Sequence, residues 1–199
     1  MIKDNGLGNT IELGDEVKFG PRFEFVVDGN NNCIKIEEGS HLRSGRVHIR
    51  TNGNKLWFGR KCMFNGGIVF VDGQGELVFG DGTTVMGARI SFHENGRISF
   101  GRDCMLSSEI RMDVSDMHSI LDKNTNKRIN PPADINIGAH VWIGYGVFVT
   151  NGVSIGDNCI IGAKSLVSND IPPNCLAVGI PARVTRTDVT WDRRRLPIE

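Results

Sequence analysis

The stretch "DVSDMHSILD" (residues 113–122) places a single histidine, His118, among acidic side chains. Imidazole is the side chain best suited to accept and return a proton near neutral pH, and a neighbouring carboxylate can orient its ring. Asp116 and Asp122 are close enough in sequence to do this, and a backbone carbonyl would serve equally well. Residue type alone favours a solvated loop histidine, so a role as general base needs support from the rest of the chain.

A repeated pentapeptide runs through most of the chain and is interrupted at this stretch. Each copy begins with a large apolar residue, usually followed by Gly, and ends with a small or β-branched residue. The copies are LGDEV (13–17), IEEGS (36–40), FGRKC (58–62), FGDGT (79–83), FGRDC (100–104), IGAHV (137–141) and IGDNC (155–159). Their starts are 23, 22, 21 and 21 residues apart up to Phe100, and then 37 and 18 residues apart.

This repeat predicts an all-β solenoid, because an 18-residue period corresponds to three six-residue faces and each coil buries its core only by stacking on its neighbours. We expect one β-helix domain over residues 1–186. The parts are wider coils at 11–112 with hairpin-like or turn excursions, a loop at 113–134, strict hexapeptide coils at 135–170, and a C-terminal tail at 187–199.

The cysteines and the overall charge exclude several function classes. Cys62, Cys104 and Cys159 occupy the small inward position of the repeat, where a thiol acts as a small apolar side chain. Basic and acidic residues balance at 23 each, so neither a nucleic-acid footprint nor a polybasic membrane patch is indicated. The chain has no apolar run of transmembrane length and no secretory signal pattern at its start. We therefore expect a cytoplasmic location, either free or peripheral to the inner face of the membrane.

The segment "INIGAHVWIGYGVFVTNGVSIGDNCIIGAKSLVSNDIPPNCLAVGIPARV" (135–184) resembles the hexapeptide-repeat acyltransferases through its VWIG strand, DIPP turn and GIPARV ending. The resemblance implies a left-handed parallel β-helix, a homotrimer with active sites between subunits, and acetyl-CoA as co-substrate. "SDMHSILD" followed by "RINPPADINIGAHVWIG" most resembles the O-acetyltransferases of bacterial capsules and surface polysaccharides, including those that act on sialic acid polymers.

The resemblance changes the interpretation of His118 and adds Trp142. His118 lies in the loop that, in this family, faces a cleft between subunits, and its spacing to Trp142 is similar to the family's. We therefore expect His118 to be the general base, with Asp116 as one candidate to orient it. Strand alternation places Val141 and Ile143 inward and Trp142 outward. The resemblance implies that Trp142 flanks the thioester and the pantetheine arm.

The same resemblance implies a coenzyme A groove beside the last coils. Arg183 and Arg186 are expected to meet phosphate groups, because guanidinium matches phosphate geometry. Many relatives carry Thr-Lys where this chain has Ser168-Asn169, which removes one positive charge near the cofactor. The residues expected to line the groove are Trp142, Gly144, Tyr145, Ala163, Lys164, Ser168, Asn169, Arg183 and Arg186.

The acceptor site is the least defined part of the sequence. Arg89, Arg111 and Asp113 come from coils near His118, and arginines there could bind an anionic sugar carboxylate. Surface ion pairs are an equally good interpretation of these residues.

Three other functions remain as alternatives to O-acetyl transfer. The first is N-acetylation of an amino-sugar nucleotide, which needs the same base. The second is a catalytically silent scaffold, which does not explain His118 and Trp142. The third is a zinc hydratase with His93, His118 and His140 as ligands, but the zinc histidines of such solenoids include a closely spaced pair that this chain lacks. We therefore expect no metal.

Overall fold

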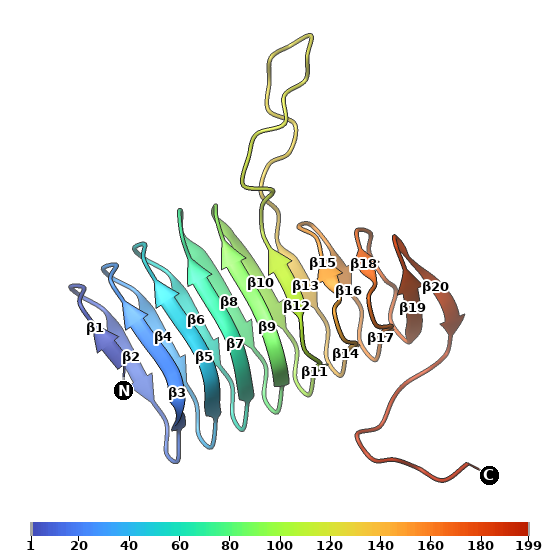
Figure 1. The fold of residues 1–199 in the computed structure, drawn as a ribbon, viewed down its shortest axis with the longest axis horizontal. Coiled ribbons are helices and arrows are strands. Elements are labelled where there is room, and N and C mark those ends of the chain that lie inside the picture. The colour runs from blue at the N-terminus through green and yellow to red at the C-terminus, as the bar shows by residue number, and fades with distance from the viewer. Residues whose placement is uncertain (1, 199) are drawn as a thin grey trace.

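Backbone hydrogen bonds between successive coils build a three-sided parallel β-helix (Figure 1). The computed structural model describes residues 2–198. Strands up to β18 pair in parallel with the equivalent strands of the neighbouring coils. Leu56, for example, is in register with Ile34 on one side and Leu77 on the other. Equivalent residues of the repeat therefore form columns along the solenoid.

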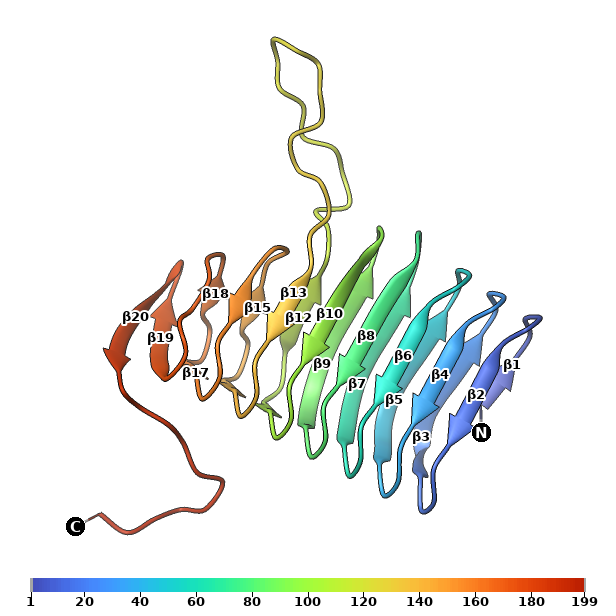
Figure 2. The same cartoon turned by 180° about the vertical axis from the view of Figure 1, so that it is seen from behind.

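The strands form two sheets (Figures 1 and 2). The larger sheet contains β1 (Ile2–Asp4), β3 (Lys18–Val27), β5 (His41–Ile49), β7 (Met63–Phe70), β9 (Thr84–Phe92), β11 (Met105–Leu106), β12 (Ile110–Asp113), β14 (Trp142–Ile143), β15 (Phe148–Val149), β17 (Ile160–Ile161), β18 (Leu166–Val167), β19 (Cys175–Gly179) and β20 (Ala182–Thr187). The smaller sheet contains β2 (Thr10–Leu13), β4 (Cys33–Ile36), β6 (Lys55–Phe58), β8 (Gly75–Phe79), β10 (Gly96–Phe100), β13 (Ile135–Ile137) and β16 (Ser154–Ile155).

The larger sheet bends along its length and so forms two of the three faces. In β5 and β7 the bend lies at Gly45 and Gly66, whose φ angles are 119° and 136°. A Cβ on Gly45 would lie 1.8 Å from the Gly66 carbonyl oxygen, so only glycine fits there. In later coils the bend separates pairs of short strands. We call the side of β11, β14 and β17 the first face, the side of β12, β15 and β18 the second face, and the smaller sheet the third face.

The longer period of the early coils comes from longer strands. Of the two expected kinds of excursion, the turns are present and the hairpins are not, because strands β1 to β18 pair only in parallel and the antiparallel strand pair of residues 2–198 is β19 with β20. Stretches such as "VDGNNN" (27–32) are tight turns between faces. Most of the extra residues lengthen strands: β4 and β6 have four residues each, where β16 has two.

The core is a set of stacked columns. Phe79 stacks on Phe58 and on Phe100 with ring centroids 4.8 and 4.9 Å apart. Cys62, Cys104 and Cys159 are 3%, 0% and 0% exposed, which confirms their expected inward position. Sheet hydrogen bonds fix the spacing of the columns, and that spacing suits offset ring stacking.

Buried asparagines close the corner between the second and third faces in the early coils. The Oδ1 atom of Asn32 accepts hydrogen bonds from the backbone N–H and the side-chain amide of Asn54, at 2.8 and 2.9 Å. Asn9 holds Asn32 in the same way, and Asn54 in turn accepts from the Gly75 N–H at 2.8 Å. This ladder satisfies polar groups that would be costly to bury unpaired.

Two segments leave the solenoid. Residues 114–134 project from the corner between β12 and β13 as a long loop, and residues 188–198 return beneath the coils (Figure 1). A short antiparallel contact between Leu121 and Arg128 closes the loop on itself. In the part of the chain that the structure describes, no helix has the length and apolar character needed to cross a bilayer.

Replacing the middle ring of the phenylalanine column tests the core. Phe79→Ala removes stacking on both neighbours and leaves a cavity, so we expect the free energy of unfolding to fall by about 3–5 kcal/mol. Phe79→Leu should cost less than about 1.5 kcal/mol because it preserves most of the volume. Urea denaturation followed by circular dichroism measures both; equal losses for the two variants would contradict the stacked core.

Candidate functional site

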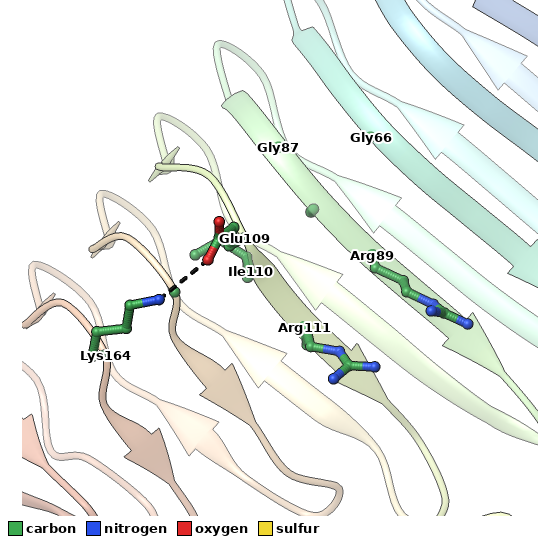
Figure 3. Close-up of a pocket in the computed structure, with 9 residues that line it drawn as sticks. Gly66, Gly87, Arg89, Glu109, Ile110, Arg111 and Lys164 are labelled. Atoms are coloured by element: carbon green, nitrogen blue, oxygen red, sulfur yellow. Dashed lines mark hydrogen bonds and ion pairs between the residues drawn. The ribbon is translucent and has the colours of Figure 1, made fainter.

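The second face carries two adjoining pockets that share Arg89 and Arg111 (Figure 3). The first pocket reaches the corner with the first face and ends at Lys164 and Glu109. The second reaches the base of the loop, and its lining includes Arg89, Ser91, His93, Arg111, Met112, Asp113, Ser115, Asp116, Met117 and Phe148. A single groove on one face therefore connects an expected cofactor residue with the segment that carries His118.

Arg89 and Arg111 are directly adjacent in this groove. They are register partners on β9 and β12, are both exposed, and point along the same face (Figure 3). Neighbouring strands are about 4.8 Å apart, so two like charges stand close together. Within residues 2–198 neither guanidinium has an ion-pair or hydrogen-bond partner, so the ion-pair interpretation is wrong for the two arginines, whereas Asp113 does pair with His93. Two unneutralised guanidinium groups side by side favour an anion between them.

A histidine–aspartate pair lies at the loop end of the groove. His93 Nδ1 donates to Asp113 Oδ2 at 2.5 Å, and Asp113 Oδ1 accepts the Ser115 N–H at 3.2 Å. Burial raises the pKa of the Asp113 carboxyl even though the hydrogen bond from His93 acts in the opposite direction. With Nδ1 engaged, the ring is fixed in orientation and Nε2 is the nitrogen left for a ligand. From the sequence, His93 is considered only as a possible zinc ligand, and its pairing with Asp113 is not predicted.

His118 itself is exposed, on the loop directly beyond the groove. Its backbone N–H donates to the Asp116 carbonyl at 2.8 Å, and its carbonyl accepts from Asn130 Nδ2 at 2.8 Å. The carboxylates considered for orienting its ring are engaged elsewhere. Asp116 accepts from Asn130 at 3.0 Å, and Asp122 accepts the Asn124 and Thr125 N–H groups at 3.0 and 2.7 Å.

One ion pair ties the loop to the solenoid. Arg128 forms a bidentate pair with Glu94, with both N–O distances at 2.6 Å. Hydrogen bonds from Arg128 hold the pKa of Glu94 at about 2. Glu94 lies next to His93 in the turn after β9, so this contact sets where the loop leaves the second pocket.

Trp142 lies on the first face, away from the groove. Val141 and Ile143 are both 0% exposed and Trp142 is 39% exposed, which confirms the outward orientation expected from strand alternation. The loop with His118 leaves from the opposite edge of the solenoid, between β12 and β13 (Figures 1 and 2). A single chain therefore keeps His118 and Trp142 on separate edges.

The expected cofactor residues fall into three groups. Gly144, Tyr145, Ala163 and Lys164 lie at the corner between the first and second faces; Ser168 and Asn169 follow β18; Arg183 and Arg186 are exposed on β20. At the corner, Lys164 Nζ lies 3.2 Å from Glu109 Oε2 and 4.3 Å from the Tyr145 ring centroid. Of these three groups, only the corner residues reach the groove of the second face, through Lys164.

The histidines do not assemble a metal site. His93 pairs with Asp113, and His140 pairs with Asp103 at 2.6 Å. Among residues 2–198 no group of three or more histidine, cysteine or acidic side chains is arranged to hold a metal ion.

Comparison with known proteins gives matches along the whole chain. The family model described as bacterial transferase hexapeptide (six repeats) matches residues 134–169. The crystal structure of the polySia-specific acetyltransferase NeuO is 31% identical, with a TM-score of 0.87 over 98% of this chain and 89% of that one. The chain belongs to the hexapeptide-repeat acyltransferases. The polysialic acid O-acetyltransferase OatWY superposes with a TM-score of 0.92 at 29% identity, over 98% of this chain and 93% of that one.

Two curated members of the family agree with these structures. A polysialic acid O-acetyltransferase of Neisseria meningitidis is 29% identical over 143 residues, which are 72% of this chain and 66% of the relative. One from Escherichia coli O1:K1 / APEC is 32% identical over 134 residues, 67% of this chain and 43% of the relative. The matched region spans less than two thirds of either relative. The left-handed parallel β-helix expected from the sequence is confirmed by the structural match.

The anchor of the loop can be tested by proteolysis. Glu94→Gln removes the charge that holds Arg128, so we expect trypsin to cleave after Lys123 and Lys127 several-fold faster through local opening. Glu76→Gln, which loosens Arg97 on the third face, is the matched control and should leave loop cleavage unchanged. The anchor is complete above pH 4.5, the ordinary pKa of glutamate, and weakens as the pH falls through about 2. Equal cleavage in both variants would contradict this anchor.

Proposed function

We propose that the protein transfers an acetyl group from acetyl-CoA to a hydroxyl of an acidic sugar in a bacterial capsular or surface polysaccharide, in the cytoplasm. The observation that carries this proposal is the pair of unpartnered arginines, Arg89 and Arg111, in a groove that ends beside the loop of His118. Two relatives of similar fold are named for acetyl transfer to polysialic acid, whose sugars carry carboxylates.

In this proposal His118 is the general base. Its ring accepts the proton of the sugar hydroxyl while the oxygen attacks the thioester carbonyl of acetyl-CoA. The tetrahedral oxyanion then collapses, the carbon–sulfur bond breaks, and the proton passes from the imidazolium to the departing thiolate. The exposed position of His118 on the loop leaves its ring accessible to a sugar. Asp116 stays a candidate for orienting the ring once a substrate is bound.

The complete site needs more than one copy of the chain. His118 and Trp142 lie on separate edges of a single solenoid, so the base of one subunit meets the Trp142 face of another in the proposed homotrimer. The loop supports this arrangement with large apolar side chains that are at least half exposed: Met117, Ile120, Leu121 and Ile129. Coenzyme A would then follow the last coils, with its acyl arm at Trp142, its chain at Tyr145 and Lys164, and its phosphates at Arg183 and Arg186.

The groove of the second face is the proposed acceptor site. Arg89 and Arg111 bind the carboxylate of an acidic sugar through paired N–H donors, because guanidinium groups match carboxylate geometry. His93, held by Asp113, offers its other ring nitrogen to a sugar hydroxyl. The sugar next to the loop would thus be held by charge at one end and by a hydrogen bond at the other.

Loss of the base tests the reaction. Acetyl transfer from acetyl-CoA is measured on sialylated, neutral and amino-sugar acceptors. We expect transfer to the sialylated acceptor, and a fall in kcat of about 10²- to 10⁴-fold in His118→Ala. His48→Ala, a histidine of the early coils paired with Asp28, is the matched control and should retain wild-type kcat. Full activity in His118→Ala would contradict the base, and no transfer to any acceptor would favour a scaffold.

The arginine pair sets acceptor specificity. We expect Arg111→Gln to raise KM for the sialylated acceptor about tenfold or more, since it loses a charge-assisted hydrogen bond. KM for acetyl-CoA and for a neutral acceptor should stay unchanged. Arg97→Gln on the third face, paired with Glu76, is the control. An equal rise in KM for acidic and neutral acceptors would show that Arg111 does not recognise the carboxylate of the sugar.

A further inference from the structure

The C-terminal tail contributes a second tryptophan beside Trp142. The Trp191 and Trp142 ring centroids are 6.2 Å apart at an interplanar angle of 53°, a geometry typical of aromatic pairs. Trp191 is only 8% exposed, although it lies in an otherwise exposed segment. It is therefore held in place by contacts of its own, and Trp142 keeps the larger exposed surface.

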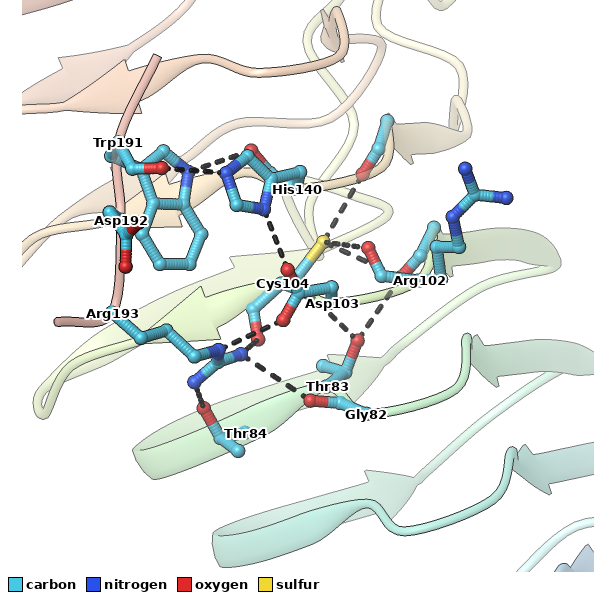
Figure 4. A network of polar contacts seen from close by, with 12 residues as sticks. Gly82, Thr83, Thr84, Arg102, Asp103, Cys104, His140, Trp191, Asp192 and Arg193 are labelled. Carbon is cyan, nitrogen blue, oxygen red and sulfur yellow. Dashed lines mark hydrogen bonds and ion pairs between the residues drawn. The ribbon is translucent and has the colours of Figure 1, made fainter.

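His140 also contacts Trp191 (Figure 4). The two rings stack at 4.1 Å with an interplanar angle of 6°, and the Trp191 indole N–H donates to the His140 carbonyl at 2.7 Å. The His140 ring faces two acceptors, the Trp191 carbonyl at 2.8 Å and the Asp103 carboxylate at 2.6 Å. Both ring nitrogens of His140 are therefore engaged, one by the tail and one by the coil of Asp103.

Arg193 is the second anchor of the tail (Figure 4). Its guanidinium donates to Asp103 Oδ1 at 2.8 Å, Thr84 Oγ1 at 3.0 Å and the Cys104 carbonyl at 3.1 Å. Burial raises the pKa of Asp103, but hydrogen bonds from His140 and Arg193 outweigh this and hold it below its ordinary value. Asp103 therefore contacts both Arg193 of the tail and His140 of the next coil, which ties the tail to two different coils.

We propose that Trp191 is a positioning residue of the cofactor site: it holds the Trp142 indole in the orientation that receives the acyl arm of acetyl-CoA. This rests on the proposed function, in which Trp142 flanks the thioester. Trp191 acts through Trp142 because it has almost no free surface of its own. A tryptophan at a solenoid surface otherwise samples several rotamers. A Trp142 indole in the wrong rotamer would bind the acyl arm of acetyl-CoA less tightly.

The test is acetyl-CoA binding by the full-length protein without acceptor, measured by titration calorimetry. We expect Trp191→Ala to raise the Kd for acetyl-CoA roughly 3- to 10-fold, the range that the loss of one aromatic pair gives. Trp191→Phe keeps an aromatic ring against Trp142 and should bind within about twofold of wild type. KM for the sugar acceptor should not move, because the acceptor groove lies on another face.

Two further variants separate positioning from folding. Arg193→Ala leaves Trp191 in the chain but removes an anchor, and is expected to shift the Kd for acetyl-CoA in the same direction. Trp57→Ala removes an exposed tryptophan of the early coils that contacts Lys35, and should leave the Kd unchanged. Far-ultraviolet circular dichroism reports the coupling of the Trp142 and Trp191 rings, which Trp191→Phe should diminish and Trp57→Ala should not.

An unchanged Kd in Trp191→Ala, with the dichroic signal lost, would overturn the inference, as would a lower melting temperature without a change in Kd. Failure of the proposed function is distinct from this. A wild-type protein that binds acetyl-CoA but acetylates no sugar refutes the proposed reaction and leaves the positioning role of Trp191 supported. A wild-type protein that does not bind acetyl-CoA refutes both.

Discussion

The parallel hydrogen bonding between successive coils is the interaction on which the rest of the structure depends. It holds equivalent residues of each repeat about 4.8 Å apart in straight columns. Inward columns become continuous apolar stacks such as Phe58, Phe79 and Phe100. Outward columns bring the side chains of successive coils next to one another, whether their charges are alike or opposite. A single coil could not bury its inward side chains, because they are covered only by the side chains of the neighbouring coils.

This constraint explains why the groove of the second face is charged. Arg89 and Arg111 stand in one column, and the spacing of the sheet brings their guanidinium groups together without an ion pair to either of them within residues 2–198. Other columns pair opposite charges, as where Arg60 meets Asp81 at 2.7 Å or Arg97 meets Glu76 at 3.0 Å. Repulsion between the two arginines lowers stability unless a ligand anion relieves it, which is a common property of binding sites.

The two segments that depart from the repeat are each fastened by an arginine–carboxylate contact. Arg128 with Glu94 holds the loop beside the groove of the second face, and Arg193 with Asp103 holds the tail beside Trp142. The repeat fixes the direction in which each side chain of the solenoid projects, so few of its positions can place a side chain outside a column. The loop carries His118 and the tail packs beside Trp142, and the two departures lie at opposite edges of the coil.

The sequence by itself determined the solenoid, the inward cysteines and the outward Trp142, because these follow from a local repeat and from strand alternation. It also singled out His118, through the break in the repeat together with the family resemblance. Only the tertiary structure decided that the extra residues of the early coils lengthen strands, that His93 pairs with Asp113, and that Arg89 and Arg111 have no partners in residues 2–198. It also decided that Trp191 packs beside Trp142, a contact between residues 49 positions apart. Such contacts depend on side-chain direction across coils and on where the tail folds back, and neither leaves a periodic signal in the chain.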